Sequence, residues 1–433
     1  MTEDYKEVIV MLSKLKQLFA RLKQSKDGKT LVANFGYLSL LQVAGYVFPL
    51  ITMPYLARVI GVEGFGKIAF AAAIMVWFQT IADWGFNYTA TRDVAKNRDD
   101  KEKVSEIFSN VLWARILLML VSFVALAICV MTIPKLRENA DVIMISFLMI
   151  PGHIMFPDWF FQAMERMKYI TILNIISKTL FTIAIFLFIK EREDYILQPL
   201  FTSLGFVVSG IIAMYYILIK WKIRLHFTSF KVIIKTIKSS TDVFINNLMP
   251  NLWNALSTVL LGFLWGNVAN GILDAGKRFQ QTCGNLFGVV TRVFYPFLSR
   301  RIDQHRLYVK VSMSLAFVMM LLLFVFAPII IDIFFGEEFS ESVIVLRLYA
   351  ISLLFWALDN VYGVNYMLVN GYDKQLRNMT IISSIVACIS AYPLIYFYSY
   401  VGVAIVYNIG LGLLGVLPMI FTINDKRKKN LIN

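Results

Sequence analysis

A predicted helix over residues 272–298 carries a row of polar side chains through an apolar stretch of the chain. Intervals of 4, 3, 4 and 7 residues place the members of this row on one helical face: Asp274, Arg278, Gln281, Asn285 and Arg292. Lys277 lies beside the row. A charge at the centre of a bilayer costs about 3 kcal/mol, so cations along a whole helix indicate a water-filled cavity that binds an anion. A dry polar seam, with Asp274 paired to Arg278, is the alternative.

Polar rows also occur on two other predicted helices, 68–91 and 245–265. The first row comprises Gln79, Asp83 and Asn87, and the second comprises Asn247, Asn251 and Asn254. Each helix belongs to the opening pair of its half of the chain, so we expect the rows to face each other across a central cavity. For helix 245–265, hydrogen bonds to a neighbouring helix explain the asparagines equally well.

Single charges within or beside other apolar segments also require an explanation. Lys178 lies near the middle of a predicted helix, which favours a paired or cavity position, and Asp359 lies deep enough to need a partner. Arg115 and Arg347 lie near helix ends, where they either reach the headgroups or face the cavity. Arg58, just outside the first helix, is either an entrance charge or an interfacial anchor.

The composition requires a membrane protein, because 58% of the 433 residues are hydrophobic, 16% are charged and the mean hydropathy is +0.66. Apolar runs of about 20 residues are long enough to cross a bilayer. The sequence therefore predicts an all-α integral membrane fold with twelve transmembrane helices, at 31–57, 68–91, 111–132, 141–164, 169–189, 197–219, 245–265, 272–298, 309–330, 343–367, 379–400 and 402–423.

The distribution of basic residues predicts the orientation of these helices. The net charge is +14, but Lys and Arg gather at helix ends, which does not indicate nucleic-acid binding. They concentrate in the loops on the side of the N-terminus, whereas the alternate loops hold only six. Because Lys and Arg accumulate on the cytoplasmic side, we expect both termini to be cytoplasmic.

The chain is predicted to consist of two six-helix halves, 31–219 and 245–423, joined by an interfacial helix within 220–244. Residues 1–30 are predicted to form a cytoplasmic amphipathic segment, and residues 424–433 a basic tail. Each half opens with a proline-containing helix followed by a short turn with a shared glycine spacing, 61 to 66 and 266 to 271. Both halves start on the same side, as in a parallel repeat.

The sequence offers little support for a cofactor, a metal site or covalent catalysis. Cys129, Cys283 and Cys388 lie within apolar segments, the three histidines lack metal-ligand spacing, and no P-loop, GxSxG or HExxH motif is present. We expect no cofactor. Asp83 or Asp359 could couple transport to a proton or sodium gradient, or could simply balance the arginines, which we favour slightly.

Four short motifs resemble those of Wzx-type polysaccharide flippases in order and placement. They are ARVIGVEGFG at 57–66, TRDVA at 91–95, DWFFQ at 158–162 followed by Glu165, and FGEEF at 335–339. For the third motif an aromatic belt with a charged cap is the favoured interpretation, and a substrate role for Asp158, Gln162 and Glu165 is the alternative.

The resemblance implies the MATE-like fold of the multidrug/oligosaccharidyl-lipid/polysaccharide superfamily. It also implies a flippase of the bacterial cytoplasmic (inner) membrane that moves undecaprenyl-pyrophosphate-linked sugar repeat units from the inner to the outer leaflet. The cationic cavity attributed to such flippases corresponds here to Lys277, Arg278 and Arg292, with Lys178. Expected partners are the lipid-linked oligosaccharide, membrane lipids and polysaccharide polymerase machinery, without nucleic acid.

Three other functions are less consistent with the sequence. A cation-coupled multidrug exporter of the same fold would need an acidic cavity, but helix 31–57 contains no Asp or Glu. Lipid II flippases usually resemble fourteen-helix chains. A membrane polysaccharide polymerase or glycosyltransferase would typically need a large catalytic loop outside the membrane, and the predicted outer loops are short.

Overall fold

The computed structural model describes residues 26–298 and 305–432. The amphipathic helix predicted near the N-terminus lies largely outside these residues. The described elements are helical and include no β-strand. In order they are α2 (Lys26–Asp83), α3 (Phe86–Lys96), α4 (Lys101–Thr132), α5 (Pro134–Arg137), α6 (Ala140–Phe147), α7 (Met149–Met155), α8 (Asp158–Ala163), α9 (Met167–Phe188), η1 (Arg192–Ile196), α10 (Leu197–Tyr215), η2 (Tyr216–Lys220), α11 (Phe230–Leu298), α12 (His305–Phe334), η4 (Glu337–Phe339), α13 (Ser342–Leu358), η5 (Asp359–Leu368) and α14 (Asp373–Ile432).

Within the described part of the chain, nine helical segments are long and apolar enough to cross a membrane. Three of them contain a residue with non-helical backbone angles: α2 at Gly61, α11 at Gly266 and α14 at Ser399. The breaks fall in or beside the short turns predicted between pairs of helices. Helices satisfy their own backbone hydrogen bonds, which is why a chain this apolar spans a membrane repeatedly in this form. The chain is a multi-pass membrane protein.

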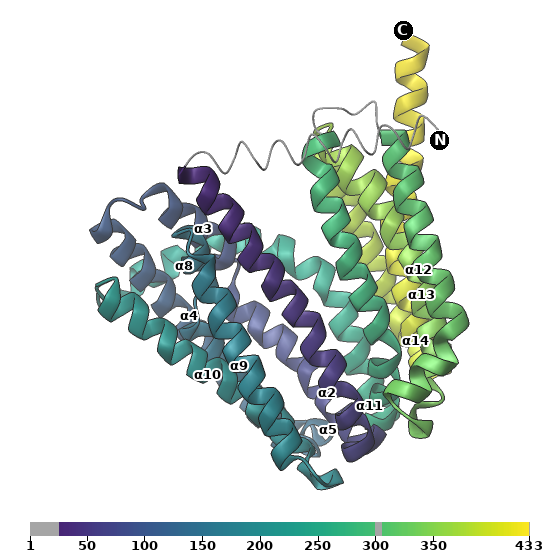
Figure 1. Cartoon of the computed structure of the whole chain (residues 1–433), viewed down its shortest axis with the longest axis horizontal. Helices are drawn as coiled ribbons and strands as arrows, with labels where there is room; N and C mark the ends of the chain where they lie inside the picture. Colours follow the sequence, from purple (N-terminus) through teal and green to yellow (C-terminus); the bar gives the residue numbers. More distant parts are fainter. Residues whose placement is uncertain (1–25, 299–304, 433) are drawn as a thin grey trace.

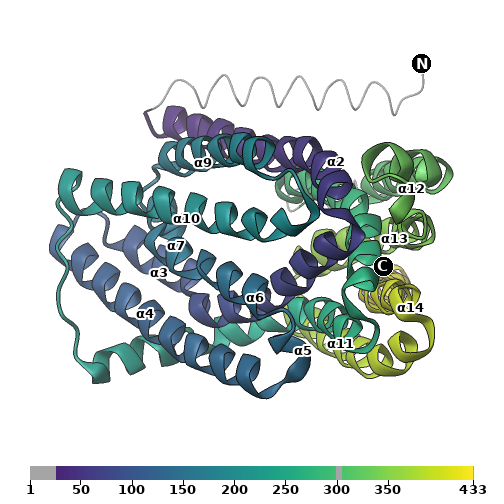
Figure 2. The same ribbon diagram turned by 90° about the horizontal axis from the view of Figure 1, so that it is seen from below.

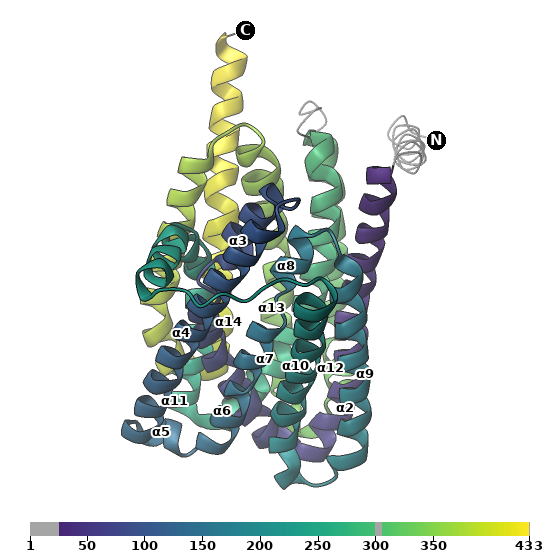
Figure 3. The ribbon, with the colours of Figure 1, turned by 90° about the vertical axis from the view of Figure 1, so that its left-hand side faces the viewer.

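The helices form two groups that splay apart toward one end (Figure 1). The first helix group contains α2–α10, and the second contains α12–α14 with the part of α11 after Gly266. Seen from below, α2 and α11 lie between the two groups (Figure 2). The start of α2 and the end of α14 lie at the same end of the bundle, here called the terminus end (Figure 3). The opposite end, where α2 and α11 bend, is called the turn end.

The connection between the groups differs from the helix predicted over residues 220–244. Residues 221–229 form no helix, and α11 starts at Phe230 and continues into the next apolar segment. The Ser109 hydroxyl of α4 accepts a hydrogen bond from the His226 backbone N–H (3.0 Å). This bond satisfies an N–H group that would otherwise pair with a carbonyl in a helix. From Phe230 onward the chain forms the predicted amphipathic helix, and its apolar residues Ile233 and Ile237 pack on the core of the first helix group.

Two glycines let the bends of α2 and α11 touch through their backbones. A Cβ atom at Gly66 would overlap the Asn267 carbonyl, and a Cβ atom at Gly271 would overlap the Val62 carbonyl. The contacts are reciprocal, because each joins the residue directly after one bend to the glycine five positions after the other bend. Only glycine permits so close an approach.

Side chains add further contacts across the turn end. Glu338 accepts a hydrogen bond from the Val62 N–H (3.2 Å) and forms an ion pair with Arg192. Phe65 packs edge-on against Phe335 and Phe339, with ring centroids 5.8 and 5.7 Å apart. The two groups are therefore joined at the turn end and separate toward the terminus end.

Candidate functional site

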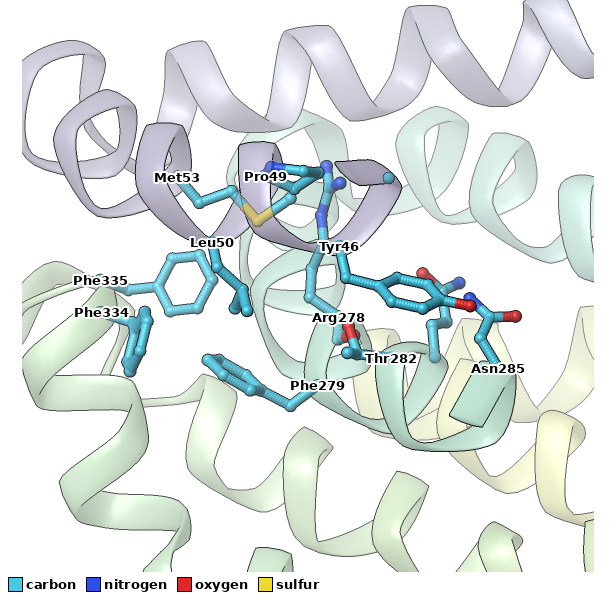
Figure 4. A pocket seen from close by; sticks show the side chains of 12 residues that line it. Tyr46, Pro49, Leu50, Met53, Arg278, Phe279, Thr282, Asn285, Phe334 and Phe335 are labelled. Carbon is cyan, nitrogen blue, oxygen red and sulfur yellow. The ribbon is translucent and has the colours of Figure 1, made fainter. Parts of the chain in front are cut away.

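A cavity of about 160 Å³ lies between α2 of the first group and α11 and α12 of the second. One wall is polar and comes from the predicted row on α11, and the other walls are mainly apolar or aromatic (Figure 4). The lining residues are Gly45, Tyr46, Pro49, Leu50, Met53, Arg278, Phe279, Gln281, Thr282, Asn285, Phe334 and Phe335. The cavity therefore lies where the two helix groups begin to separate.

The bend of α11 positions the polar wall. Arg278 follows Gly271 by seven residues, which places it about 10 Å along the helix from the glycine contact. In Figure 4 the Arg278 side chain extends from α11 toward α2. Gln281, Thr282 and Asn285 follow within the next two helical turns and face the same cavity.

The Arg278 guanidinium belongs to a three-residue charge cluster, defined by Asp274, Lys277 and Arg278. Asp274 is buried and accepts hydrogen bonds from Nε (2.8 Å) and Nη2 of Arg278. Its other carboxylate oxygen lies 3.2 Å from Lys277 Nζ. One carboxylate thus faces two cations, so the cluster keeps a formal charge of +1.

Arg278 presents that charge to the cavity. Its side chain remains 35% exposed, compared with 14% for Lys277. The guanidinium carbon also lies 5.6 Å from the centre of the Phe65 ring, a cation–π contact that stabilises its position. A guanidinium has five N–H donors, and two are used by Asp274, so donors remain for an anion in the cavity.

Lys178 of α9 adds positive charge next to the same cavity. Its Nζ lies 3.7 Å from the place that a Cβ atom at Gly45 would occupy, and Gly45 lines the cavity. No carboxylate pairs with Lys178 in the described part of the chain. The structure therefore places Lys178 beside one lining residue of the cavity, on the side of the first helix group.

Asp83, in contrast, lies in a second charge cluster inside the first helix group. Arg115 of α4 forms an ion pair with one carboxylate oxygen, and Nε2 of His153 on α7 lies 3.6 Å from the other. Arg115 is only 1% exposed, so it does not reach the headgroups from its helix end. Sequence reasoning missed His153 as a partner because the three histidines are isolated along the chain.

Three other predicted site residues lie away from the cavity. Arg58 is exposed at the turn end and donates a hydrogen bond from Nη2 to the Ile333 carbonyl (2.7 Å). Arg347 donates from Nε to the Phe324 carbonyl (3.2 Å), within the second group. Asp359 starts η5, with its carboxylate against Gly363, and has no cationic partner among residues 26–298 and 305–432.

The predicted asparagines are distributed differently. Asn87 lines a second cavity, of about 430 Å³, between α3 and α8. Asn254 is half-buried on α11. The side chains of Asn251 and Arg292 lie outside the described ones.

The aromatic and apolar walls of the first cavity were not predicted. Tyr46, Pro49 and Met53 come from α2, and Phe334 and Phe335 from the end of α12. The Tyr46 hydroxyl accepts a hydrogen bond from Gln42 Nε2 (2.6 Å), which orients the ring. Aromatic residues are common in membrane helices, so only the neighbouring Gly45 and Pro49 could have marked this part of α2.

Comparison with known proteins gives matches over nearly the whole chain. The sequence profile of the family described as "Polysaccharide biosynthesis protein" matches residues 31–302. A protein of Escherichia coli (strain K12) is 28% identical over 403 residues, covering 91% of this chain and 97% of its own. One of Shigella dysenteriae is 25% identical over 388 residues, covering 86% and 95%. Both carry the name "Putative O-antigen transporter".

Solved structures show the same fold. An inward closed conformation of the lipid II flippase MurJ superposes with a TM-score of 0.73 at 17% identity, covering 91% of this chain and 87% of MurJ. An inward-facing multidrug transporter of the MATE family superposes with a TM-score of 0.63 at 14% identity, covering 90% and 97%. The fold is MATE-like, as the sequence motifs implied. The chain belongs to the polysaccharide biosynthesis protein family.

Proposed function

We propose that this protein moves undecaprenyl-pyrophosphate-linked oligosaccharide repeat units from the inner to the outer leaflet of the bacterial cytoplasmic membrane. The names of its two relatives and the MATE-like fold support a lipid-linked oligosaccharide flippase. The observation that carries the proposal is the partly exposed Arg278 guanidinium, which faces a cavity between the two helix groups, with Lys178 beside the lining residue Gly45.

The chemistry of the cavity suits a diphosphate linked to a sugar. Arg278 would donate charge-assisted hydrogen bonds to phosphate oxygens, and Lys178 would add a second positive charge. Gln281, one turn from Arg278, offers an amide donor beside the pyrophosphate, and Asn285 offers both a donor and an acceptor for the first sugar. Asp274 would hold Arg278 in place, with Lys277 balancing the carboxylate. We propose that Arg292, Asn251 and Asn254 continue this polar path along α11.

We further propose that twelve helices form two six-helix halves, since dividing α2, α11 and α14 at their breaks gives two spans each. The reciprocal contacts at Gly66 and Gly271 support a two-fold relation between the halves. With both termini cytoplasmic, the turn end is periplasmic and the cavity is accessible from the cytoplasm. Transport then consists of rocking the halves so that the turn end opens and the terminus end closes.

The acidic residues receive different proposed roles. Asp83 balances Arg115 and His153 and does not contact the substrate. Arg58 and Arg347 also have structural roles, because each donates a hydrogen bond to a backbone carbonyl, at the turn end and within the second group respectively. Asp359, which has no cationic partner in the described residues, is the better candidate for binding a coupling proton or sodium ion.

Replacing Arg278 tests the proposal. In cells that depend on this protein for surface polysaccharide, Arg278→Gln is expected to abolish the surface polymer and to leave lipid-linked repeat units in the inner leaflet. Arg347→Gln is the matched control, because it removes an arginine that packs on Phe324 away from the cavity. Normal surface polymer in the Arg278→Gln cells would refute a role for the cavity in transport.

A further inference from the structure

The cavity between α3 and α8 lies apart from the proposed pyrophosphate site. It is lined by Asn87, Tyr88, Thr91 and Arg92 of α3 and by Asp158 and Gln162 of α8. Two of the sequence motifs, TRDVA and DWFFQ, supply four of these six residues. Neither motif has a role in the pyrophosphate site, so their convergence on one cavity requires its own explanation.

The cavity lies toward the terminus end of the first helix group (Figures 1 and 3). The end of α2 at Asp83 follows Gly66 by 17 residues, so it lies about 25 Å from the glycine contact, and Asn87 comes just after this end, in α3. Arg278 lies about 10 Å from its own contact glycine, so the two sites are separated by about 15 Å along the bundle axis. A ligand that occupied both would have to be elongated.

Three contacts hold the walls of this cavity in place. The Thr91 hydroxyl lies 3.2 Å from the Trp159 carbonyl oxygen and links α3 to α8. Glu165, two residues after the end of α8, forms an ion pair with Arg98 (2.9 Å), and its carbonyl accepts a hydrogen bond from Asn34 (3.1 Å). The walls of the cavity are therefore held both by the lining residue Thr91 and by groups outside the lining.

The lining is polar but electrically balanced. Arg92 donates a hydrogen bond from Nε to the neighbouring Asp93 (2.9 Å), and Asp158 contributes a second carboxylate to the lining. The lining therefore holds one cation, which is already paired with Asp93, and one anion, so it carries no net positive charge to attract a phosphate group. The cluster at Arg278 differs, because its cations exceed its anions.

The polar groups in the lining fit a polyhydroxylated ligand. A sugar hydroxyl both donates and accepts hydrogen bonds, and the cavity offers amide donors and acceptors from Asn87 and Gln162 together with the Asp158 carboxylate. Asn87 Oδ1 is buried and has no hydrogen-bond partner among the described residues, so a rotation of this side chain toward the cavity would let a ligand hydroxyl satisfy it. Tyr88, which is 65% exposed, offers a ring on which the apolar face of a sugar can stack.

We propose that the α3–α8 cavity binds the outer sugars of the oligosaccharide while Arg278 and Lys178 hold its pyrophosphate. This inference rests on the proposed function and assigns the glycan its own subsite, at the end of the bundle from which the substrate enters. Gln162 and Asn87 are then specificity-determining residues for the sugar, and Arg278 binds a part common to all repeat units.

Cysteine protection in inverted membrane vesicles tests the subsite. Cys129→Ser, Cys283→Ser and Cys388→Ser remove the native thiols, and single cysteines are introduced by Gln162→Cys in the subsite and Gln281→Cys in the first cavity. Lys168→Cys, at an exposed position after α8, is the control. Maleimide labelling rates are compared in vesicles that contain the lipid-linked repeat unit, in vesicles from a strain lacking the initiating sugar-phosphate transferase, and in the latter supplied with undecaprenyl pyrophosphate.

The repeat unit is expected to slow labelling at position 162 by about tenfold at a concentration about ten times its Kd, while undecaprenyl pyrophosphate alone leaves this rate unchanged. Both ligands should slow labelling at position 281, and neither should affect position 168. Equal protection of position 162 by both ligands would overturn the proposal and identify a lipid phosphate as the occupant.

The remaining outcomes separate the subsite from the proposed function. Protection of position 281 without protection of position 162 would overturn the subsite and leave the flippase function intact. Protection of position 162 by the repeat unit without protection of position 281 would support the subsite and refute the pyrophosphate site. No protection at either position would refute both.

Discussion

The first and second helix groups each hold an aspartate between two basic side chains, but the two clusters differ in what they expose. In the first group, Asp83 meets Arg115 and His153, and the arginine is 1% exposed. In the second, Asp274 meets Lys277 and Arg278, and the arginine is 35% exposed. An aspartate–arginine pair therefore serves internal packing in one group and presents a guanidinium to a cavity in the other.

The difference follows from where each aspartate lies relative to its arginine. Asp274 and Arg278 are one turn apart on a single helix, so the arginine can satisfy its partner and still extend into the space beside the helix. Asp83 and Arg115 lie on two packed helices, α2 and α4, and each side chain fills the space between them. A polar row that the sequence predicts to line a cavity can therefore form its contacts with a neighbouring helix instead, as Asp83 does with Arg115.

The largest effect is expected from breaking the buried cluster. Arg115→Gln leaves Asp83 without its strong partner in a low-dielectric interior, which should destabilise the protein by about 3–5 kcal/mol. Thermal unfolding of the detergent-purified protein, followed by fluorescence-detected gel filtration, measures the loss. Arg115→Gln combined with Asp83→Asn removes both charges and should recover most of the stability. If the double variant is no more stable than Arg115→Gln alone, the loss of stability does not come from an unpaired Asp83 carboxylate.

Arg278→Gln should produce the reverse pattern. Its stability should change by about 1 kcal/mol or less, because the side chain is partly solvated and Asp274 keeps Lys277 as a partner. Binding of undecaprenyl pyrophosphate should weaken by about 10- to 100-fold, the value of one or two charge-assisted hydrogen bonds. Ligand-induced thermal stabilisation of the purified protein measures both quantities. If Arg278→Gln greatly lowered the stability and left binding unchanged, Arg278 would have the same structural role as Arg115, and the proposed difference between the two clusters would be wrong.

Lys178→Gln should have the smallest effect and sharpens the comparison further. Removing one positive charge near the cavity should weaken undecaprenyl pyrophosphate binding by about 3- to 10-fold and reduce its dependence on salt concentration. Stability should stay the same or rise slightly, because a half-buried lysine without a carboxylate partner is removed. Lys168→Gln, at an exposed position, is the control. Equal affinities in the two variants would exclude Lys178 from the site.

The sequence predicted the helical membrane fold because apolar length alone requires spanning helices. It also predicted the positions of the bends, since Gly61 and Gly266 have the backbone freedom that a tight turn needs. The twelve-helix count and the two halves remain predictions.

The sequence predicted a shared cavity face where one helix supplied the information. The spacing of Arg278, Gln281 and Asn285 placed them on one face, and all three line the first cavity. It was incomplete where contacts joined distant segments: Asp83 could not be matched to Arg115 and His153, 32 and 70 positions away, by any local pattern. Tyr46 was missed for a related reason, because a single aromatic residue in a membrane helix is unremarkable until the facing helix is known.

The reciprocal contact of Gly66 and Gly271 has a consequence for the speed of the transport cycle. The touching atoms belong to backbones, so re-forming the contact immobilises no side-chain rotamers and carries little entropic cost on each return. In the proposed transport cycle, this backbone contact can therefore open and reclose without a slow ordering step of its own.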